Sequence, residues 1–258
     1  MCSRENKMKK KQPKPPIAIA RAAQNDPLPR LRVMFFILAS ILLLVLSLSP
    51  VSKVFAAEDN EFAGERIVHL LQEPRHRTVH NEGDLYLLDV QVNPGDTSLP
   101  HVHDQAIMLT YISMADGPRD GQIGNNIDYA SEAITHKVSN AGPGLFRIIA
   151  LVNGSAGNID LQSDRPTGLS GEPELENAWF RSYRVELAPG EETKVQHHQL
   201  PSVVVQVVDG LLQVTRDDQV IDELDHPGNW SWRKAGQSYS VKNVGGISTA
   251  VVINEGRF

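Results

Sequence analysis

The residues with the clearest chemical potential are two histidines at the end of the stretch 94–103. The sequence there reads Pro-Gly-Asp-Thr-Ser-Leu-Pro-His-Val-His, so a Pro-Gly turn is followed by His101 and His103. In an extended strand, residues at i and i+2 point to the same face, so both imidazoles are expected to converge on one point. Imidazole is a common ligand for zinc, copper, nickel and iron. The spacing therefore favours a metal site, provided that neighbouring strands position it.

The sequence around this pair predicts strands. Alternating or continuous apolar runs cover 85–92, 101–112, 134–139 and 145–152, and turn clusters such as Asn-Pro-Gly and Asn-Ala-Gly-Pro-Gly separate them. The segment 113–128 is rich in Gly, Asp and Asn and is expected to be a loop. No segment has a sustained helical period, so the fold class is predicted to be all-β.

The same pattern returns about one hundred residues later, which indicates an internal duplication. The Pro-Gly turn at 94–95 recurs at 189–190, Asn140 recurs as Asn243, and Asn153 recurs as Asn254. Matched landmarks in the same order predict two copies of one unit. We therefore divide the chain into an N-terminal barrel at 57–155, a polar linker at 156–178 and a C-terminal barrel at 179–258.

Residues 1–56 differ in composition from the rest of the chain. A basic front precedes an apolar run at 33–49, and the segment 54–57, which ends in the small residues Ala56 and Ala57, follows it. This order is typical of a bacterial export signal, and the prediction is a periplasmic or extracellular protein. The alternative is an uncleaved membrane anchor formed by residues 33–49. Membrane contact is expected only through this segment.

Charge follows the same division. Residues 1–56 hold ten Lys/Arg and two Asp/Glu, whereas the remaining 202 residues hold fifteen and twenty-nine, a balance of −14. An acidic chain lacks the clustered positive face that duplex binding needs, so nucleic acid is excluded as a partner. Cys2 is the only cysteine, so no disulfide framework supports the exported part.

The histidine pair belongs to a longer pattern. Gly95 is followed after five residues by His101-Val-His103, and a later His136 is followed after three residues by Asn140. This pattern resembles the two sequence motifs of the cupin superfamily, and the duplication makes the chain similar to a bicupin. The resemblance implies two tandem jelly-roll, cupin-like barrels. It also implies a metal inside the first barrel, held by His101, His103 and His136.

The chain departs from the cupin motif at one ligand. In the family a glutamate completes the metal site, and by spacing it should fall at Ile107 or Met108, neither of which has a carboxylate. Three histidines alone still suit iron, zinc, nickel or copper. Gln105 is a candidate weak fourth partner, and Asp104 is expected to point away. The alternative is that the histidines fill a polar barrel mouth and hydrogen-bond to each other and to water.

The second copy has lost more of the motif. Gln196 and His198 stand where the first copy has His101 and His103, Val203 stands at the glutamate position, and Tyr239 replaces the second-motif histidine. A metal is not expected there. A supporting barrel is the leading interpretation, and a polar pocket for an organic ligand is the alternative.

The remaining aromatic and polar candidates are interpreted as structural. His69, His76 and His80 have no acidic or cysteine partner in sequence and are expected to lie on a solvated surface stretch. Asn140 and Asn243 are interpreted as turn residues. The three tryptophans are expected to be packing anchors rather than a sugar or aromatic site.

Three functional hypotheses follow. The leading one is a divalent transition metal site that acts on a small organic molecule, with a dioxygenase-type oxidoreductase as the reaction class that the resemblance implies. The second is a non-catalytic module that binds a sugar or an organic acid. The third is a structural or assembly role, in which the chain forms a homo-oligomer.

Overall fold

The computed structural model describes residues 61–258, and the predicted export segment lies outside the described residues. These described residues belong to one compact unit. Its regular structure is almost entirely β, with two short 3-10 helices, η1 (Leu70–Gln72) and η2 (Asp128–Ala130). Within residues 61–258, no helix has the length and apolar character needed to cross a membrane.

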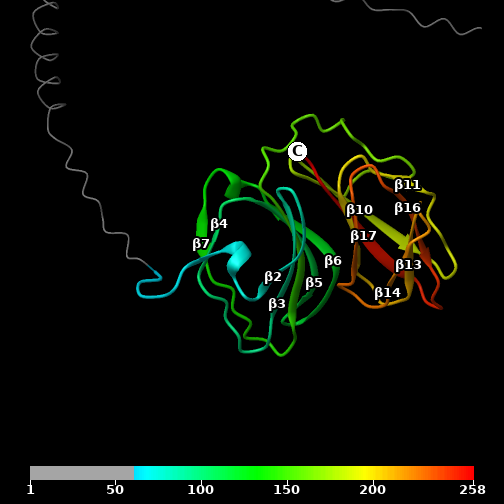
Figure 1. Cartoon of the computed structure of the whole chain (residues 1–258). Coiled ribbons are helices and arrows are strands. Elements are labelled where there is room, and N and C mark those ends of the chain that lie inside the picture. The colour runs from blue at the N-terminus through cyan, green and yellow to red at the C-terminus, as the bar shows by residue number, and fades with distance from the viewer. Residues whose placement is uncertain (1–60) are drawn as a thin grey trace, which may run out of the picture. The chain divides into compact units, whose positions relative to one another are not determined.

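The first half of this unit is built from two sheets (Figure 1). The five-stranded sheet has the order β2-β3-β8-β5-β6, and the three-stranded sheet has the order β1-β4-β7. The strands are β1 (Val68–His69), β2 (His76–Glu82), β3 (Leu85–Val92), β4 (His101–His103), β5 (Ala106–Met114), β6 (Gly117–Asn126), β7 (Ile134–His136) and β8 (Phe146–Asn153).

The second half is also built from two sheets. Its five-stranded sheet has the order β15-β12-β17-β10-β9, and its four-stranded sheet has the order β11-β16-β13-β14. The strands are β9 (Leu175–Glu176), β10 (Phe180–Leu187), β11 (Gln196–His197), β12 (Ser202–Gln206), β13 (Leu212–Arg216), β14 (Ile221–Leu224), β15 (Trp230–Arg233), β16 (Ser238–Asn243) and β17 (Thr249–Gly256).

The central strands show that the two halves are copies. In each five-stranded sheet, the last strand of the repeat lies between two earlier strands of the same repeat, as β3-β8-β5 and as β10-β17-β12. All these pairs are antiparallel. Two sheets with such non-sequential neighbours make a jelly roll, so the predicted all-β fold of two tandem barrels is confirmed.

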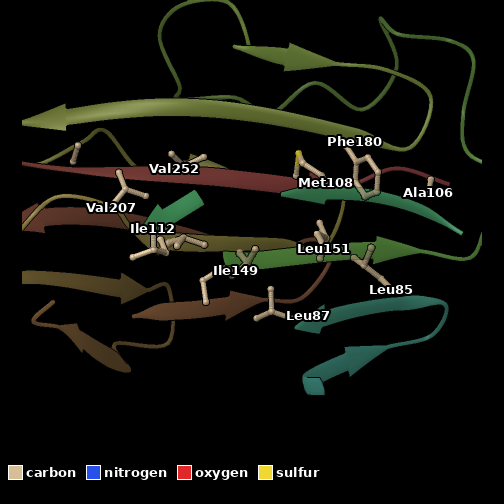
Figure 2. Close-up of a cluster of buried hydrophobic side chains, with 13 residues drawn as sticks. Leu85, Leu87, Ala106, Met108, Ile112, Ile149, Leu151, Phe180, Val207 and Val252 are labelled. Carbon is tan, nitrogen blue, oxygen red and sulfur yellow. The ribbon is translucent and has the colours of Figure 1, made fainter. Parts of the chain in front are cut away.

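The two barrels share one hydrophobic core. Leu87, Met108 and Ile149 of the first five-stranded sheet belong to the same buried cluster as Phe180 and Val252 of the second. Figure 2 shows side chains from both sheets meeting in this layer. The three tryptophans pack against the same cluster while remaining partly exposed, as expected of packing anchors.

Each half also has a core of its own. Leu88, Val90 and Ile107 lie in a cluster on the inner side of the first barrel. Tyr239 and Val241 lie in the corresponding cluster of the second barrel. Because successive residues of a strand face opposite sides, each central strand contributes alternately to its own barrel and to the shared core.

One predicted loop is a strand. Residues 113–128 were expected to be a loop, but β6 occupies Gly117–Asn126 and pairs with β5. It lies at the edge of the sheet, where one side of its backbone has no neighbouring strand. An edge strand with few buried side chains tolerates Gly, Asp and Asn, so its composition carries no clear strand signal.

Candidate metal centre

Two short strands bring the three predicted histidines together. β4 and β7 pair antiparallel, and this register places His101 directly opposite His136. His103 lies two residues along β4 and therefore on the same face as His101. The Nε2 atom of His136 lies 3.1 Å from the Nε2 atoms of both His101 and His103. One candidate ligand atom from each residue lies within 4.8 Å of the others.

Burial and hydrogen bonding favour the neutral form of these imidazoles, which is the form that binds a metal. His101 and His103 are buried, and the Nδ1–H of His101 donates to the carbonyl oxygen of Leu99 at 2.9 Å. This bond places the proton of the neutral ring on Nδ1 and leaves the Nε2 lone pair facing the other rings. Burial and the neighbouring histidines lower the pKa of His103 to about 3, and burial also lowers the pKa of His101 and of His136.

The donor set fits a divalent transition metal. Zinc–nitrogen bonds are about 2.0–2.1 Å long, so two nitrogens on one tetrahedral ion lie roughly 3.3 Å apart. The two Nε2 separations of 3.1 Å are close to this value. A single proton could bridge only one of these pairs, whereas a cation would contact one nitrogen of each of the three histidines at once. His101, His103 and His136 would hold such an ion and leave at least one position open.

A fourth histidine lies beside this group. His76 was expected on a solvated surface, but it is buried on β2, with its ring centroid 4.4 Å from that of His101. Burial and the three other histidines lower its pKa to about 3. Its position follows from the pairing of β2 with β3, which turns His76 toward the three-stranded sheet; nothing in the local sequence indicates it.

Glu73 stabilises the segment next to the site, and the sequence did not predict this role. Its buried carboxylate accepts hydrogen bonds from the backbone N–H groups of Arg75 at 2.6 Å and Leu99 at 3.1 Å. Leu99 in turn accepts from His101, so Glu73 holds the segment that orients this ring. Glu73 Oε2 also lies 3.4 Å from Nδ1 of His76, without hydrogen-bond geometry.

The other two histidines of the lead-in lie nearer the surface. His69 is half-buried and contacts Asp104 at 2.9 Å, and Asp104 points away from the site as expected. His80 is half-buried, and its ring centroid lies 4.5 Å from the ring of Trp232.

The position of the missing carboxylate is Ile107. Ile107 lines the cavity beside His103, whereas Met108 on the opposite face of β5 belongs to the shared core between the barrels. Gln105 is not a fourth partner, because it lies beyond the end of β4 and its amide nitrogen packs against Gly154. The site is therefore three histidines facing an apolar side chain.

A cavity of about 300 Å³ adjoins the histidines. His76, His103 and His136 contribute to one part of its lining, and the rest is apolar or aromatic, including Ile107, Leu109, Tyr111, Tyr129, Phe146 and Ile148. None of the described residues that line it is a lysine, arginine, aspartate or glutamate. Burial raises the pKa of Tyr111, so its phenol is neutral as well.

The corresponding place in the second barrel is closed by hydrogen bonds. Gln196 lies opposite Tyr239, in the register that His101 and His136 occupy in the first barrel. Nδ1–H of His198 donates to Glu255 at 2.6 Å, and its Nε2 lies 3.1 Å from both the Tyr239 hydroxyl and Gln196 Oε1. Within residues 61–258, the first barrel's three histidines are the only group of candidate metal ligands.

A buried charge pair completes this second network. Glu255 also accepts from Arg181 at 3.1 Å, and both side chains are fully buried. The cupin motif predicts neither residue, because Glu255 lies on β17 and Arg181 lies on β10, outside the strands that contain the motif. With His198 engaged on both nitrogens, the centre of this barrel is a structural polar core.

Comparison with known proteins finds similarity of fold only. No family model and no curated protein matches the sequence. Among solved structures, AerE from Microcystis aeruginosa has a TM-score of 0.48 at 9% identity, over 72% of this chain and 99% of that one. A cupin 2 conserved barrel domain protein from Leptotrichia buccalis has a TM-score of 0.43 at 7% identity, over 70% and 88%.

A third similar structure is a variant of salicylate 1,2-dioxygenase from Pseudoaminobacter salicylatoxidans in complex with gentisate. Its TM-score is 0.49 at 9% identity, over 70% of this chain and 73% of that one. The duplication and the equivalent pairing of the motif strands in the two halves are those expected from the sequence. The chain is similar to these cupin structures in fold. At such identities the likeness concerns the fold alone, so the function of this protein is argued from its own residues.

Proposed function

We propose that this protein binds one divalent transition metal through His101, His103 and His136 and acts on a small organic molecule. The observation that carries the proposal is the convergence of three neutral imidazole nitrogens beside a cavity. When bound, such a metal supplies a Lewis acid and a template for an organic ligand. The histidines hold the ion, Glu73 fixes the segment that orients His101, and the apolar walls exclude water.

The reaction class we propose is a dioxygenase-type oxidation. In such a reaction both atoms of O₂ enter the organic molecule, which itself supplies the electrons, so no separate reductant is required. A gentisate complex of a dioxygenase with a similar fold is consistent with this class. Iron, nickel and copper suit the reaction, whereas zinc has no redox chemistry.

Elemental analysis of the purified protein tests the proposal. We expect about one iron, nickel or copper per chain, lost in His101→Ala and retained in His226→Ala, which removes an exposed histidine far from the site in sequence. A wild-type protein without metal, together with unchanged thermal stability in His101→Ala, would reject the metal site. One zinc per chain would keep the site and reject the oxidation.

A non-catalytic binding module is the second candidate, because the cavity would accept a small ligand with or without turnover. Ligand binding that persists after chelation, with no oxygen consumption, would favour this module over the enzyme.

Export is part of the proposal. The basic front, the apolar run at 33–49 and the acidic remainder support it. The measured mass of the protein recovered from the periplasm or medium should correspond to loss of residues 1–56, and full-length protein in the membrane fraction would instead indicate an anchor.

A further inference from the structure

The lining of the cavity beside the histidines contains very few polar groups. His76, His103 and His136 contribute at one part, and Tyr111 and Tyr129 carry the only other polar side-chain atoms of the described lining. The remaining contacts come from aliphatic side chains, Met114 and Phe146. None of the described residues that line it is a lysine, arginine, aspartate or glutamate, so the walls have no side chain that carries a permanent charge.

This chemistry limits what the cavity can hold. A charged group inside it would lose its hydration without gaining a partner of opposite charge, and such burial is strongly unfavourable. A sugar would bring many hydroxyl groups to walls with few hydrogen-bond partners, and each unpaired group opposes binding. Only one place is suited to a strongly polar group, namely the open side of the three-histidine site.

The volume sets the size of the ligand. An apolar cavity of about 150 Å³ can hold benzene. At about 300 Å³, this cavity has room for one ring with a substituent of a few heavy atoms.

The geometry points to a ligand with two distinct ends, and this inference rests on the proposed function. One end is a single oxygen-donor group that faces the metal held by His101, His103 and His136. The other end is an uncharged, apolar body of about one ring, which packs against Ile107, Leu109 and Phe146. Sugars and acids with two or more separated carboxylates are outside this class.

A matched pair of probes tests the class directly. 4-Isopropylbenzoate and terephthalate both offer a carboxylate to the metal, and they differ only in having an isopropyl group or a second carboxylate at the far end. Binding is measured by titration calorimetry on the zinc-loaded and the metal-free protein, because zinc permits binding without turnover. We expect at least tenfold tighter binding of 4-isopropylbenzoate to the zinc form, and no measurable binding of glucose at the same concentrations.

A variant of the cavity wall provides the second readout. Leu109 is half-buried on β5, so Leu109→Arg should add a cation to the lining while the strand keeps its pairing. We expect this change to reduce or reverse the tenfold preference. Leu211→Arg, at an exposed leucine of the second half, is the matched control and should leave it unchanged. If Leu109→Arg does not fold, the wild-type preference alone decides.

The outcomes separate this inference from the proposed function. Zinc binding with equal or tighter binding of terephthalate, or with binding of glucose, would overturn the ligand class and leave the metal site standing. Absence of zinc binding together with a persistent preference for 4-isopropylbenzoate would support the apolar cavity and overturn the metal site. Absence of binding by either benzoate would overturn the ligand class.

Discussion

Ile107 stands where the cupin resemblance places a carboxylate ligand, and its side chain lines the cavity beside His103. Two residues were candidates for this position from spacing, and they lie on opposite faces of β5. The structure assigns the position to Ile107 because Met108 packs between the two barrels. This difference can be tested by restoring the carboxylate at each residue in turn.

Ile107→Glu is expected to lower the stability of the metal-free protein by about 2 kcal/mol or more, because it leaves a buried acid without a partner. Divalent manganese should then raise the melting temperature more in the variant than in wild type, since a carboxylate suits this hard ion and binding stabilises the folded state. Thermal melts with and without manganese measure the difference.

The control is Met108→Glu, which places the same acid on the neighbouring residue. Its side chain would enter the shared core, where no histidine can join it in holding a metal. Manganese should not rescue this variant. Equal rescue of both variants would contradict the assignment of the ligand position.

At the scale of elements, two equivalent asparagines hold the turns that close the repeats. Nδ2 of Asn140 donates to the carbonyl oxygens of Val92 and Gly144, each at 2.8 Å. Nδ2 of Asn243 donates to Leu187 and Ile247 at 3.0 and 2.8 Å. Each asparagine thus joins the end of one strand to the turn before another, which agrees with the structural role expected from sequence.

Asn140→Ala should cost about 1–3 kcal/mol of unfolding free energy, because it leaves buried carbonyl groups without donors. Metal content should stay the same, because Asn140 contacts none of the three histidines by hydrogen bond. Chemical denaturation and elemental analysis measure the two effects. Asn93→Ala, at an exposed turn residue, should change the unfolding free energy by less than about 0.5 kcal/mol. Loss of metal from a folded Asn140→Ala protein would show a role beyond the turn.

At the scale of the whole molecule, the two barrels are joined by side chains as well as by the chain. The shared core contains buried residues of both five-stranded sheets (Figure 2). Two asparagines that mark the repeats also form hydrogen bonds between the halves. Nδ2 of Asn254 donates to Thr110 at 2.8 Å, and Nδ2 of Asn153 donates to the Arg257 carbonyl at 2.8 Å. We therefore expect both barrels to unfold together.

Phe180→Ala removes a fully buried ring from this shared core and should cost about 3–5 kcal/mol. Calorimetry of wild type should give one transition, and the variant should give one transition at a lower temperature. Phe258→Ala, at a phenylalanine that is 55% exposed, is the control and should change little. Two transitions, of which only one moves in Phe180→Ala, would show that the barrels unfold independently.

The sequence alone determined the strands, the duplication and the three histidines of the candidate site. Strand periodicity and motif spacing are local properties, so the convergence of His101 and His103 could be predicted from the alternation of side chains. The cupin resemblance added His136, which β7 brings opposite His101. The edge strand β6 was missed because its polar composition lacks the alternation that identifies a buried strand.

Only the tertiary structure decided what surrounds these residues. Three features depend on which strands become neighbours across sheets. They are the burial of His76 and Glu73, the ion pair of Glu255 with Arg181, and the position of Ile107 rather than Met108 beside the histidines. The packing of both barrels on one core has the same origin. Contacts between residues distant in sequence leave no periodic signal in the chain. The alternation of apolar and polar residues along a strand indicates which face each side chain is on, but not which residue of another strand it contacts.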